Sequence, residues 1–385
     1  PGKVAMLSSE ALWKQVQDDI NANPDARKLL AADAGRYLTG ATINIVAGKK
    51  HLAPSGDPHD YVSLGPYWWP NPAKPDGLPW IQKDGEVTPS FYEYDSTKLE
   101  TLCFAVPRLI LYARVANSAP HARRAGTLLR AWFLDEATRM KPHLRYAQFV
   151  PGVCDGRCIG IIDTTSLIFL LDAVTHLDFN PDWTPEHLAG LKAWVSQYLD
   201  WLRSSAFGRE EEAQHNNHGT WYDAQVLCYA VFCGRTELVR EQIEKRTQPR
   251  IAAQLAADGA QPHELRRTLS LTYCTYNLLA YACIAQVARD SGTDLWSWQS
   301  PNGRSLRAAL QWMLPFYAQE RAWTGKQIKP FDFTSAVLPL TLARSHPGNA
   351  LPAQLEARLE THPWQRIIFS KASISGRTVP GTTRD

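Results

Sequence analysis

Residues 184–202, TPEHLAGLKAWVSQYLDWL, are the stretch that decides the fold. Thr184 is a good helix N-cap, and the proline that follows it is favoured at the first helical position. Apolar side chains then recur every three or four residues, which predicts a helix with one buried face. That face consists of Leu188, Leu191, Trp194, Val195, Tyr198, Leu199 and Leu202.

The same period recurs along most of the chain. After Asp163 it covers residues 167–177, and no segment shows sustained alternation of apolar and polar residues with hairpin turns. A large sheet is therefore not expected, and the sequence predicts an all-α protein. Further helices are expected over residues 9–21, 97–116, 120–132, 219–233, 236–246, 264–289, 304–320 and 334–344.

Short connections with Pro or Gly join these predicted helices, which favours consecutive antiparallel pairs. No fixed-period repeat is present. An incomplete α/α toroid, a barrel of antiparallel helical hairpins with a groove at one end, fits this pattern. We expect residues 1–385 to form one such domain.

The segment from His51 to Pro89 interrupts the helices with Pro, Gly and aromatic residues. A loop longer than about 15 residues inside a compact domain is usually functional or disordered. The aromatic content of residues 65–72 (GPYWWPNP) argues against disorder. We expect an ordered aromatic lid or groove wall, the alternative being a strap that only packs over the helices.

Composition excludes some classes of protein. The chain has 41 Lys and Arg against 38 Asp and Glu, so a polybasic nucleic-acid binder is not expected. The longest apolar runs, such as residues 227–233, are far shorter than the about 20 residues of a membrane span. The 14 Trp and 14 Tyr exceed what a core requires and favour a groove that binds flat, amphipathic rings such as sugars. Ordinary core aromatics still account for most of them.

The seven cysteines do not follow a metal-binding pattern. There is no CxxC pair and no His pair at zinc-finger spacing, so a structural zinc is not expected. Cys154 and Cys158 bracket a short turn, where a small disulfide and two free thiols are both open. The sequence begins at Pro1 and shows no apolar run of a signal peptide, which fits either a trimmed mature chain or a chain shortened for expression, so we expect any targeting segment to lie outside it.

A first polar cluster is residues 215–223, HNNHGTWYD, at the start of a predicted helix. It is a weak metal site, because no carboxylate stands in helical register with both His215 and His218. It fits acid–base or charge-stabilising chemistry better, since Asn donates to a developing negative charge and His exchanges protons near neutral pH. The alternative is a helix cap with satisfied polar side chains.

A second cluster lies in residues 264–277, ELRRTLSLTYCTYN. If the segment is one helix, Arg266 and Tyr273 share a face about 10 Å apart. An Arg beside a Tyr can bind a carboxylate and lower the phenol pKa from its usual value of about 10, which suits removal of a proton alpha to a carboxylate. The pair is also common on ordinary helix surfaces.

A third cluster is residues 145–152, RYAQFVPG, followed by Gly156 and Arg157. In this bend, which Pro and Gly flank, Tyr146 and Gln148 are candidates to reach a substrate hydroxyl or carboxylate. Packing within the turn is the alternative.

These clusters, with the aromatic segment, resemble the alginate-lyase superfamily of polysaccharide lyases over about residues 40–290. The similarity is greatest to α/α-toroid mannuronate lyases and their relatives that act on alginate or glucuronan. Residues 219–221 (GTW) differ from the Ser-Tyr-Trp of a common mannuronate-lyase form, and Cys274-Thr275 replace its His-rich flank. The matching motifs are residues 55–61 (SGDPHDY), 67–70 (YWWP), 146–148 (YAQ), 216–218 (NNH), Arg266 and Tyr273.

The resemblance implies cleavage of a 4-linked uronate polymer by β-elimination, which leaves an unsaturated sugar at the new non-reducing end. The C5 proton is weakly acidic while the adjacent carboxylate is ionised, so the enzyme must neutralise that carboxylate. By resemblance, Asn217, His218 and Arg266 do so. Tyr273 is then the catalytic base and the acid that protonates O4. His218 becomes the base if the C5 proton lies on the opposite face.

The resemblance further implies a partner and no cofactor. The partner is an anionic uronate polysaccharide, neither nucleic acid nor membrane, and the expected enzyme is monomeric, needs no metal and is secreted or periplasmic in order to meet its polymer. Which uronate is cleaved, and whether from the end or within the chain, stays open. The implied substrate-binding residues are Tyr67, Trp68, Tyr146, Gln148, Arg157 and Asn216.

Two other functions remain possible at this point. A glycoside hydrolase on the same toroid needs a pair of acid and base carboxylates, and Asp60, Asp95, Asp163 and Asp223 are available. A non-catalytic protein that binds acidic polysaccharides would need no set of Asn, His, Arg and Tyr, so the intact set argues against it.

Overall fold

The computed structural model describes residues 6–180 and 182–369. The chain separates into two compact units. Among the described residues, the first unit comprises residues 17–180 and 182–211, and the second unit comprises residues 6–16 and 212–369. The single domain expected from the sequence stays a prediction.

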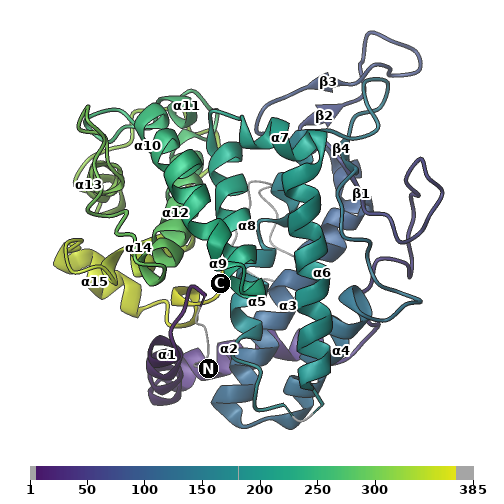
Figure 1. Ribbon diagram of the computed structural model, residues 1–385, viewed down its shortest axis with the longest axis horizontal. Coiled ribbons are helices and arrows are strands. Elements are labelled where there is room, and N and C mark those ends of the chain that lie inside the picture. The colour runs from purple at the N-terminus through teal and green to yellow at the C-terminus, as the bar shows by residue number, and fades with distance from the viewer. Residues whose placement is uncertain (1–5, 181, 370–385) are drawn as a thin grey trace. The chain divides into compact units, whose positions relative to one another are not determined.

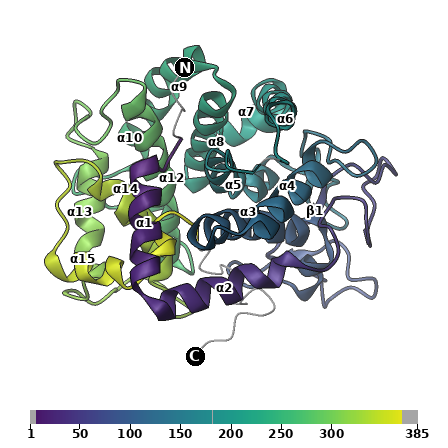
Figure 2. The same ribbon diagram turned by 90° about the horizontal axis from the view of Figure 1, so that it is seen from below.

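Helices form most of the first unit (Figure 1). They are α1 (Glu10–Ala22), α2 (Pro24–Leu38), α3 (Asp95–Ala116), α4 (Ala119–Phe133), α5 (Leu167–Val174), α6 (Pro185–Ser204) and α7 (Ala206–Glu212), of which α1 and α7 cross the boundary of the unit. α3 packs against α2, α4 and α5, and Figure 2 shows α2 running along it. The core of the unit therefore lies around α3, which is buried along most of its length.

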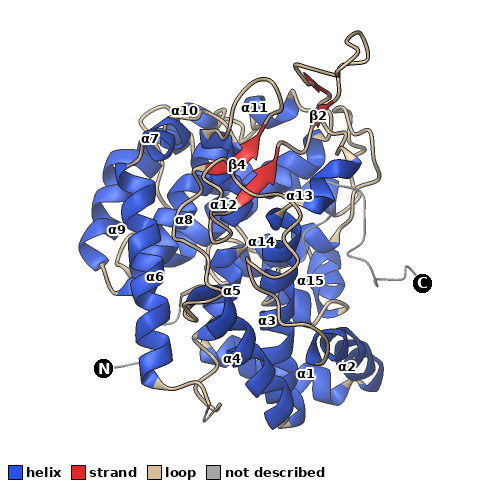
Figure 3. Cartoon of the chain, turned by 90° about the vertical axis from the view of Figure 1, so that its right-hand side faces the viewer, coloured by secondary structure: helices blue, strands red, loops and turns tan. Residues whose placement is uncertain are grey.

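The strands are short and lie in the first unit, where Figure 3 shows them in red. β1 (Val62–Leu64) pairs in parallel with β4 (Tyr146–Phe149), and β2 (Trp68–Trp69) pairs antiparallel with β3 (Ile81–Gln82). The aromatic segment from His51 to Pro89 thus contains three of the four strands found in the described residues and is ordered, as predicted. Two 3-10 helices, η1 (Pro89–Glu93) and η2 (Cys158–Thr164), follow these strands.

The second unit is built around α12 (Ser270–Asp290), which packs against α8 (Asn217–Cys233) and α14 (Thr334–Arg344). α8 and α12 are apolar on most sides and are buried accordingly. No helix in the described part of the chain has the length and hydrophobicity needed to cross a membrane. The other elements are α9 (Thr236–Gln242), η3 (Ile243–Thr247, a π-helix), α10 (Gln248–Gln254), α11 (Pro262–Leu265), α13 (Leu306–Tyr317), α15 (Ala353–Glu360) and η4 (Trp364–Arg366).

The helix start predicted at Thr184 is confirmed. The Thr184 hydroxyl accepts a hydrogen bond from the backbone N–H of His187, and the His187 ring accepts one from the N–H of Thr184. This capping box satisfies two backbone donors that a helix start would otherwise leave unpaired.

The prediction of one helix over residues 264–289 is wrong. The structure has α11 and α12 there, and residues 266–269 between them are not helical. A tertiary contact ends the helix, because Leu269 forms an isolated β-bridge with Gln327. Such a contact leaves no periodic signal in the local sequence.

Candidate active site

The start of α8 carries the Asn-Asn-His motif in the second unit. Asn216 is the N-cap, and its side-chain oxygen accepts a hydrogen bond from the backbone N–H of His218 at 3.1 Å. Asn217 is 0% exposed, whereas His218 is half-buried. The alternative interpretation of this cluster as a helix cap is therefore correct for Asn216. The side chains of Asn217 and His218 do not serve as the cap.

Glu264 of α11 holds Asn217. One carboxylate oxygen accepts the backbone N–H of Asn217 at 2.6 Å, and the other accepts its side-chain amide at 2.8 Å. Glu264 is only 1% exposed, and burial raises its pKa. The hydrogen bonds from Asn217 and the charges of Arg267 and His218 oppose that shift. The carboxylate thus fixes which end of the Asn217 amide faces it, because only the NH2 end can donate.

The predicted pairing of Arg266 with Tyr273 on one helix face is wrong. Arg266 is exposed just beyond α11, and Tyr273 lies in the first turn of α12, so the two are not on one continuous helix. Arg267 contacts the tyrosine instead, with its guanidinium carbon 3.7 Å from the centroid of the Tyr273 ring. That separation is within the range of a cation–π contact. Tyr273 itself is 5% exposed.

A buried ion pair supports the loop that leads into α8. Asp223 accepts hydrogen bonds from Arg250 at 2.8 and 3.2 Å, and Arg250 donates in turn to the backbone carbonyls of Glu212 and Gln214, each at 2.7 Å. The space beside Gly219 is filled by the Arg250 guanidinium and the Gln214 carbonyl, so a side chain there would collide with both. This explains why glycine follows the Asn-Asn-His motif here.

The first turn of α12 is capped by a residue from a distant loop. Leu269 precedes the helix and offers no side-chain acceptor. The side-chain oxygen of Gln327 accepts the N–H groups of Leu271 and Thr272 at 3.1 and 3.4 Å, and the Lys326 carbonyl accepts the N–H of Ser270 at 2.8 Å. The helix that carries Tyr273 therefore depends on this loop for its N-terminal hydrogen bonds.

We expect Gln327→Ala to lower the free energy of unfolding by about 1 kcal/mol, the usual effect of losing an N-cap. Urea unfolding would measure the change. Gln354→Ala is the matched control, because it removes only an exposed side-chain hydrogen bond to Glu320. Equal stability of the Gln327 variant and the wild type would contradict the capping role.

A polar network in the first unit joins three of the predicted substrate-binding residues. Gln148 donates to Asp163 at 2.9 Å and accepts from Arg157 at 2.9 Å, which occupies both ends of its amide. The Arg157 guanidinium lies 5.7 Å from the centroid of the Trp68 ring. Gln148 is thus buried and holds Arg157 by a hydrogen bond, whereas Arg157 and Trp68 themselves are half-buried.

The backbone around Gln148 is held in an uncommon conformation. Its φ is +48°, in the left-handed region that residues other than glycine seldom adopt. The N–H of Gln148 donates to the Ser63 hydroxyl at 2.7 Å, and Ser63 donates to Asp163. Tyr61 also donates to Asp163, at 3.1 Å. This network fixes the backbone bend that carries Tyr146 and Gln148, the two side chains predicted to reach a substrate. The two other residues predicted in this unit, Tyr67 and Tyr146, are half-buried.

Comparisons with known proteins decide the family. The sequence pattern of the alginate lyase family matches residues 45–323. An alginate lyase structure from Bacteroides ovatus is 34% identical, with a TM-score of 0.84 over 96% of this chain and 97% of that one. This chain belongs to the alginate lyase family.

More distant structures agree in fold. Alginate lyase A1-III from Sphingomonas species A1 is 16% identical, with a TM-score of 0.54 over 89% of this chain and 93% of that one. A variant of A1-III complexed with tetrasaccharide is also 16% identical, with a TM-score of 0.57 over 91% of each chain. No curated protein sequence matches. The predicted α/α-toroid fold is confirmed, and this alginate lyase is a polysaccharide lyase.

The carboxylates that a hydrolase would need have other roles in this alginate lyase. Asp223 binds Arg250, and Asp163 binds Tyr61, Ser63 and Gln148. Asp95 pairs with Lys49 at 2.5 Å, and Asp60 lies 3.1 Å from His143. Each of the four carboxylates is thus already bound by other side chains of the protein.

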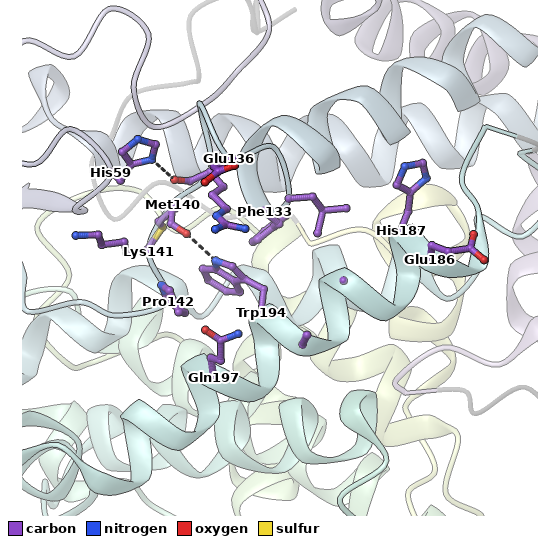
Figure 4. A pocket seen from close by; sticks show the side chains of 14 residues that line it. His59, Phe133, Glu136, Met140, Lys141, Pro142, Glu186, His187, Trp194 and Gln197 are labelled. Atoms are coloured by element: carbon purple, nitrogen blue, oxygen red, sulfur yellow. Dashed lines mark hydrogen bonds between the residues drawn. The ribbon is translucent and has the colours of Figure 1, made fainter.

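The first unit also contains a pocket of about 660 Å³ (Figure 4). It is lined by His59 and by residues of α4, α6 and the segment from Leu134 to Pro142. Figure 4 shows the Trp194 indole donating to the Met140 carbonyl, at 2.7 Å. None of the ten predicted site residues is among those that line it.

The cysteines form no disulfide. All seven lie in the described part of the chain and none is bonded to another cysteine, so the Cys154–Cys158 bridge that the sequence left open is not present. Burial raises the pKa of Cys158 to about 12, which keeps its thiol protonated. In the described part of the chain, no three His, Cys, Asp or Glu side chains gather as a metal site would require.

Proposed function

We propose that this alginate lyase cleaves 4-linked uronate polymers by β-elimination, with alginate as its substrate. The family match and the 34% identical alginate lyase support the substrate class. The observation that carries the reaction is the cluster in the second unit. There, Glu264 binds Asn217, which directly precedes His218 in the chain, and Arg267 contacts Tyr273.

Tyr273 performs both proton transfers in this scheme. Its phenolate takes the C5 proton, the released electron pair forms the C4=C5 double bond, and the C4–O4 bond breaks. The phenol then gives its proton to O4 of the leaving sugar and is restored as phenolate. One side chain suffices when the proton and the leaving group lie on the same face of the sugar ring.

Asn217, His218 and Arg266 neutralise the substrate carboxylate. The Asn217 amide uses one hydrogen to bind Glu264, which leaves a second hydrogen for a carboxylate oxygen. Neutralisation matters because the intermediate carries extra negative charge on that carboxylate, and fixed donors stabilise it without reorganisation. Within the first unit, the half-buried Arg157 and Trp68 are proposed to bind uronate residues of the polymer through their charge and ring face.

The mass of the products tests elimination against hydrolysis. Elimination yields oligouronates one water lighter than hydrolysis does, because no water is added across the cleaved bond. We expect mass spectrometry of an alginate digest to show only the lighter series. A series of hydrated, saturated products would contradict the proposal.

We also propose that the enzyme acts as a monomer outside the cytoplasm, secreted or periplasmic, because a polymeric substrate is found there. Fractionation of the source cells and light scattering of the purified protein test these two points. Recovery from the cytoplasm, or a stable dimer, would contradict them.

A further inference from the structure

The four-residue segment 264–267 contacts two separate groups of the proposed catalytic set. Its first residue, Glu264, binds Asn217 through both carboxylate oxygens, across 47 residues of sequence. Its last residue, Arg267, places its guanidinium over the Tyr273 ring. The sequence motif points to Arg266, which lies between them and is exposed.

Glu264 and Arg267 are also held to each other. The backbone N–H of Arg267 donates to the Glu264 carbonyl at 3.1 Å, which closes the turn after α11. The charge of Arg267 acts on the buried Glu264 carboxylate and opposes the effect of burial on its pKa. A shift of this turn would therefore move the partners of both Asn217 and Tyr273.

We propose that Glu264 and Arg267 are positioning residues of the reaction, Glu264 acting through Asn217 and Arg267 acting through Tyr273. This inference rests on the proposed function. Glu264 sets which end of the Asn217 amide is turned toward it, since a carboxylate repels the amide oxygen and binds the NH2. Arg267 covers one face of the Tyr273 ring and thereby restricts the direction of its hydroxyl.

Glu264→Gln tests the first half of the proposal. The glutamine keeps the size of the side chain, but its NH2 faces a donor of Asn217. Because displacement of a reacting group by about 1 Å can cost about 100-fold in rate, we expect kcat to fall by about that factor. KM is expected to stay nearly constant, which a loss of general substrate binding would not produce. A raised KM with an unchanged kcat would overturn the proposal.

A double variant shows whether Glu264 acts through Asn217. If it does, Glu264→Gln should have no further effect on kcat in an Asn217→Ala background. A loss of the same factor in both backgrounds would overturn the proposal. Should Glu264→Gln fail to fold, Glu264→Asp replaces it in the same comparison, because it keeps the charge and moves the oxygens back by one methylene group.

Arg267→Met tests the second half, with Arg358→Met as the matched control. Arg358 makes the same kind of contact in the second unit, with its guanidinium carbon 3.5 Å from the centroid of the Phe333 ring. We expect at least a tenfold lower kcat for the Arg267 variant, within the factor that general acid–base positioning contributes. Arg267→Lys should recover part of the lost kcat, and Arg358→Met should keep the wild-type kcat. Equal kcat in both methionine variants would overturn the proposal.

The wild-type assay distinguishes a failure of the proposed lyase function from a failure of the positioning roles of Glu264 and Arg267. If the wild type forms no unsaturated product from any uronate polymer, the proposed function fails before the variants are compared. If the wild type is active and the folded Glu264 and Arg267 variants match its kcat, only the positioning roles fail.

Discussion

Tyr273→Phe is expected to abolish turnover, with a loss of at least about 1,000-fold in kcat, within the range that a positioned acid–base group contributes. The ring and its contact with Arg267 remain, but the phenylalanine has no oxygen to accept the C5 proton or to protonate O4. Initial rates of unsaturated product formation measure the loss. Binding of oligouronate by the variant, followed by calorimetry, should stay close to that of the wild type.

Tyr317→Phe is the control for this variant. Its hydroxyl donates to Thr275 at 2.8 Å inside the second unit, so its removal should cost about 1 kcal/mol of stability and leave kcat unchanged. Wild-type turnover by Tyr273→Phe would remove Tyr273 from the mechanism and leave His218 as the candidate base.

Asp223→Ala is expected to lower the free energy of unfolding by about 3 to 5 kcal/mol, because it leaves the Arg250 charge buried without its partner. Arg250 binds the backbone of residues 212–214, just before the Asn-Asn-His motif, so kcat should fall as well. Thermal and urea unfolding measure the first effect, and initial rates at low temperature measure the second.

Glu241→Ala is the matched control for a surface ion pair. Glu241 pairs with Lys245 at 3.2 Å on an exposed helix face, where such pairs contribute less than about 1 kcal/mol. A loss of stability in Asp223→Ala no larger than in Glu241→Ala would show that the Asp223–Arg250 pair does not hold this loop.

Local signals predicted the strongly periodic helices well. The Thr184 capping box and the apolar face behind it gave the start of α6 correctly, and α14 has the bounds expected from its pattern. α2 was not predicted, because it buries only Ala26, Leu30 and Ala34, which form a narrow and weak apolar stripe. The short helices α7, α10 and α15 were also not predicted, since seven or eight residues carry few periodic repeats.

The candidate site was predicted in part, because motif residues can be read from sequence and their partners cannot. The motifs name Asn217, His218 and Tyr273 as candidates, but the helix break before Ser270 means that Arg266 and Tyr273 do not share one helix face. The break depends on Gln327, more than fifty residues further along the chain. Glu264 stood in the quoted segment as a lone carboxylate before two arginines, a signal that could have marked it as a partner for a polar group.

The most direct test is ultraviolet absorbance of the wild type on polymannuronate, polyguluronate, glucuronan and a neutral glucan, with Tyr273→Phe measured alongside. Absorbance of the C4=C5 double bond should rise on at least one alginate block with the wild type alone, and should not rise on the neutral glucan. A signal on one polymer also identifies the preferred uronate. New reducing ends without this absorbance would contradict elimination, and equal absorbance with Tyr273→Phe would contradict the role of Tyr273.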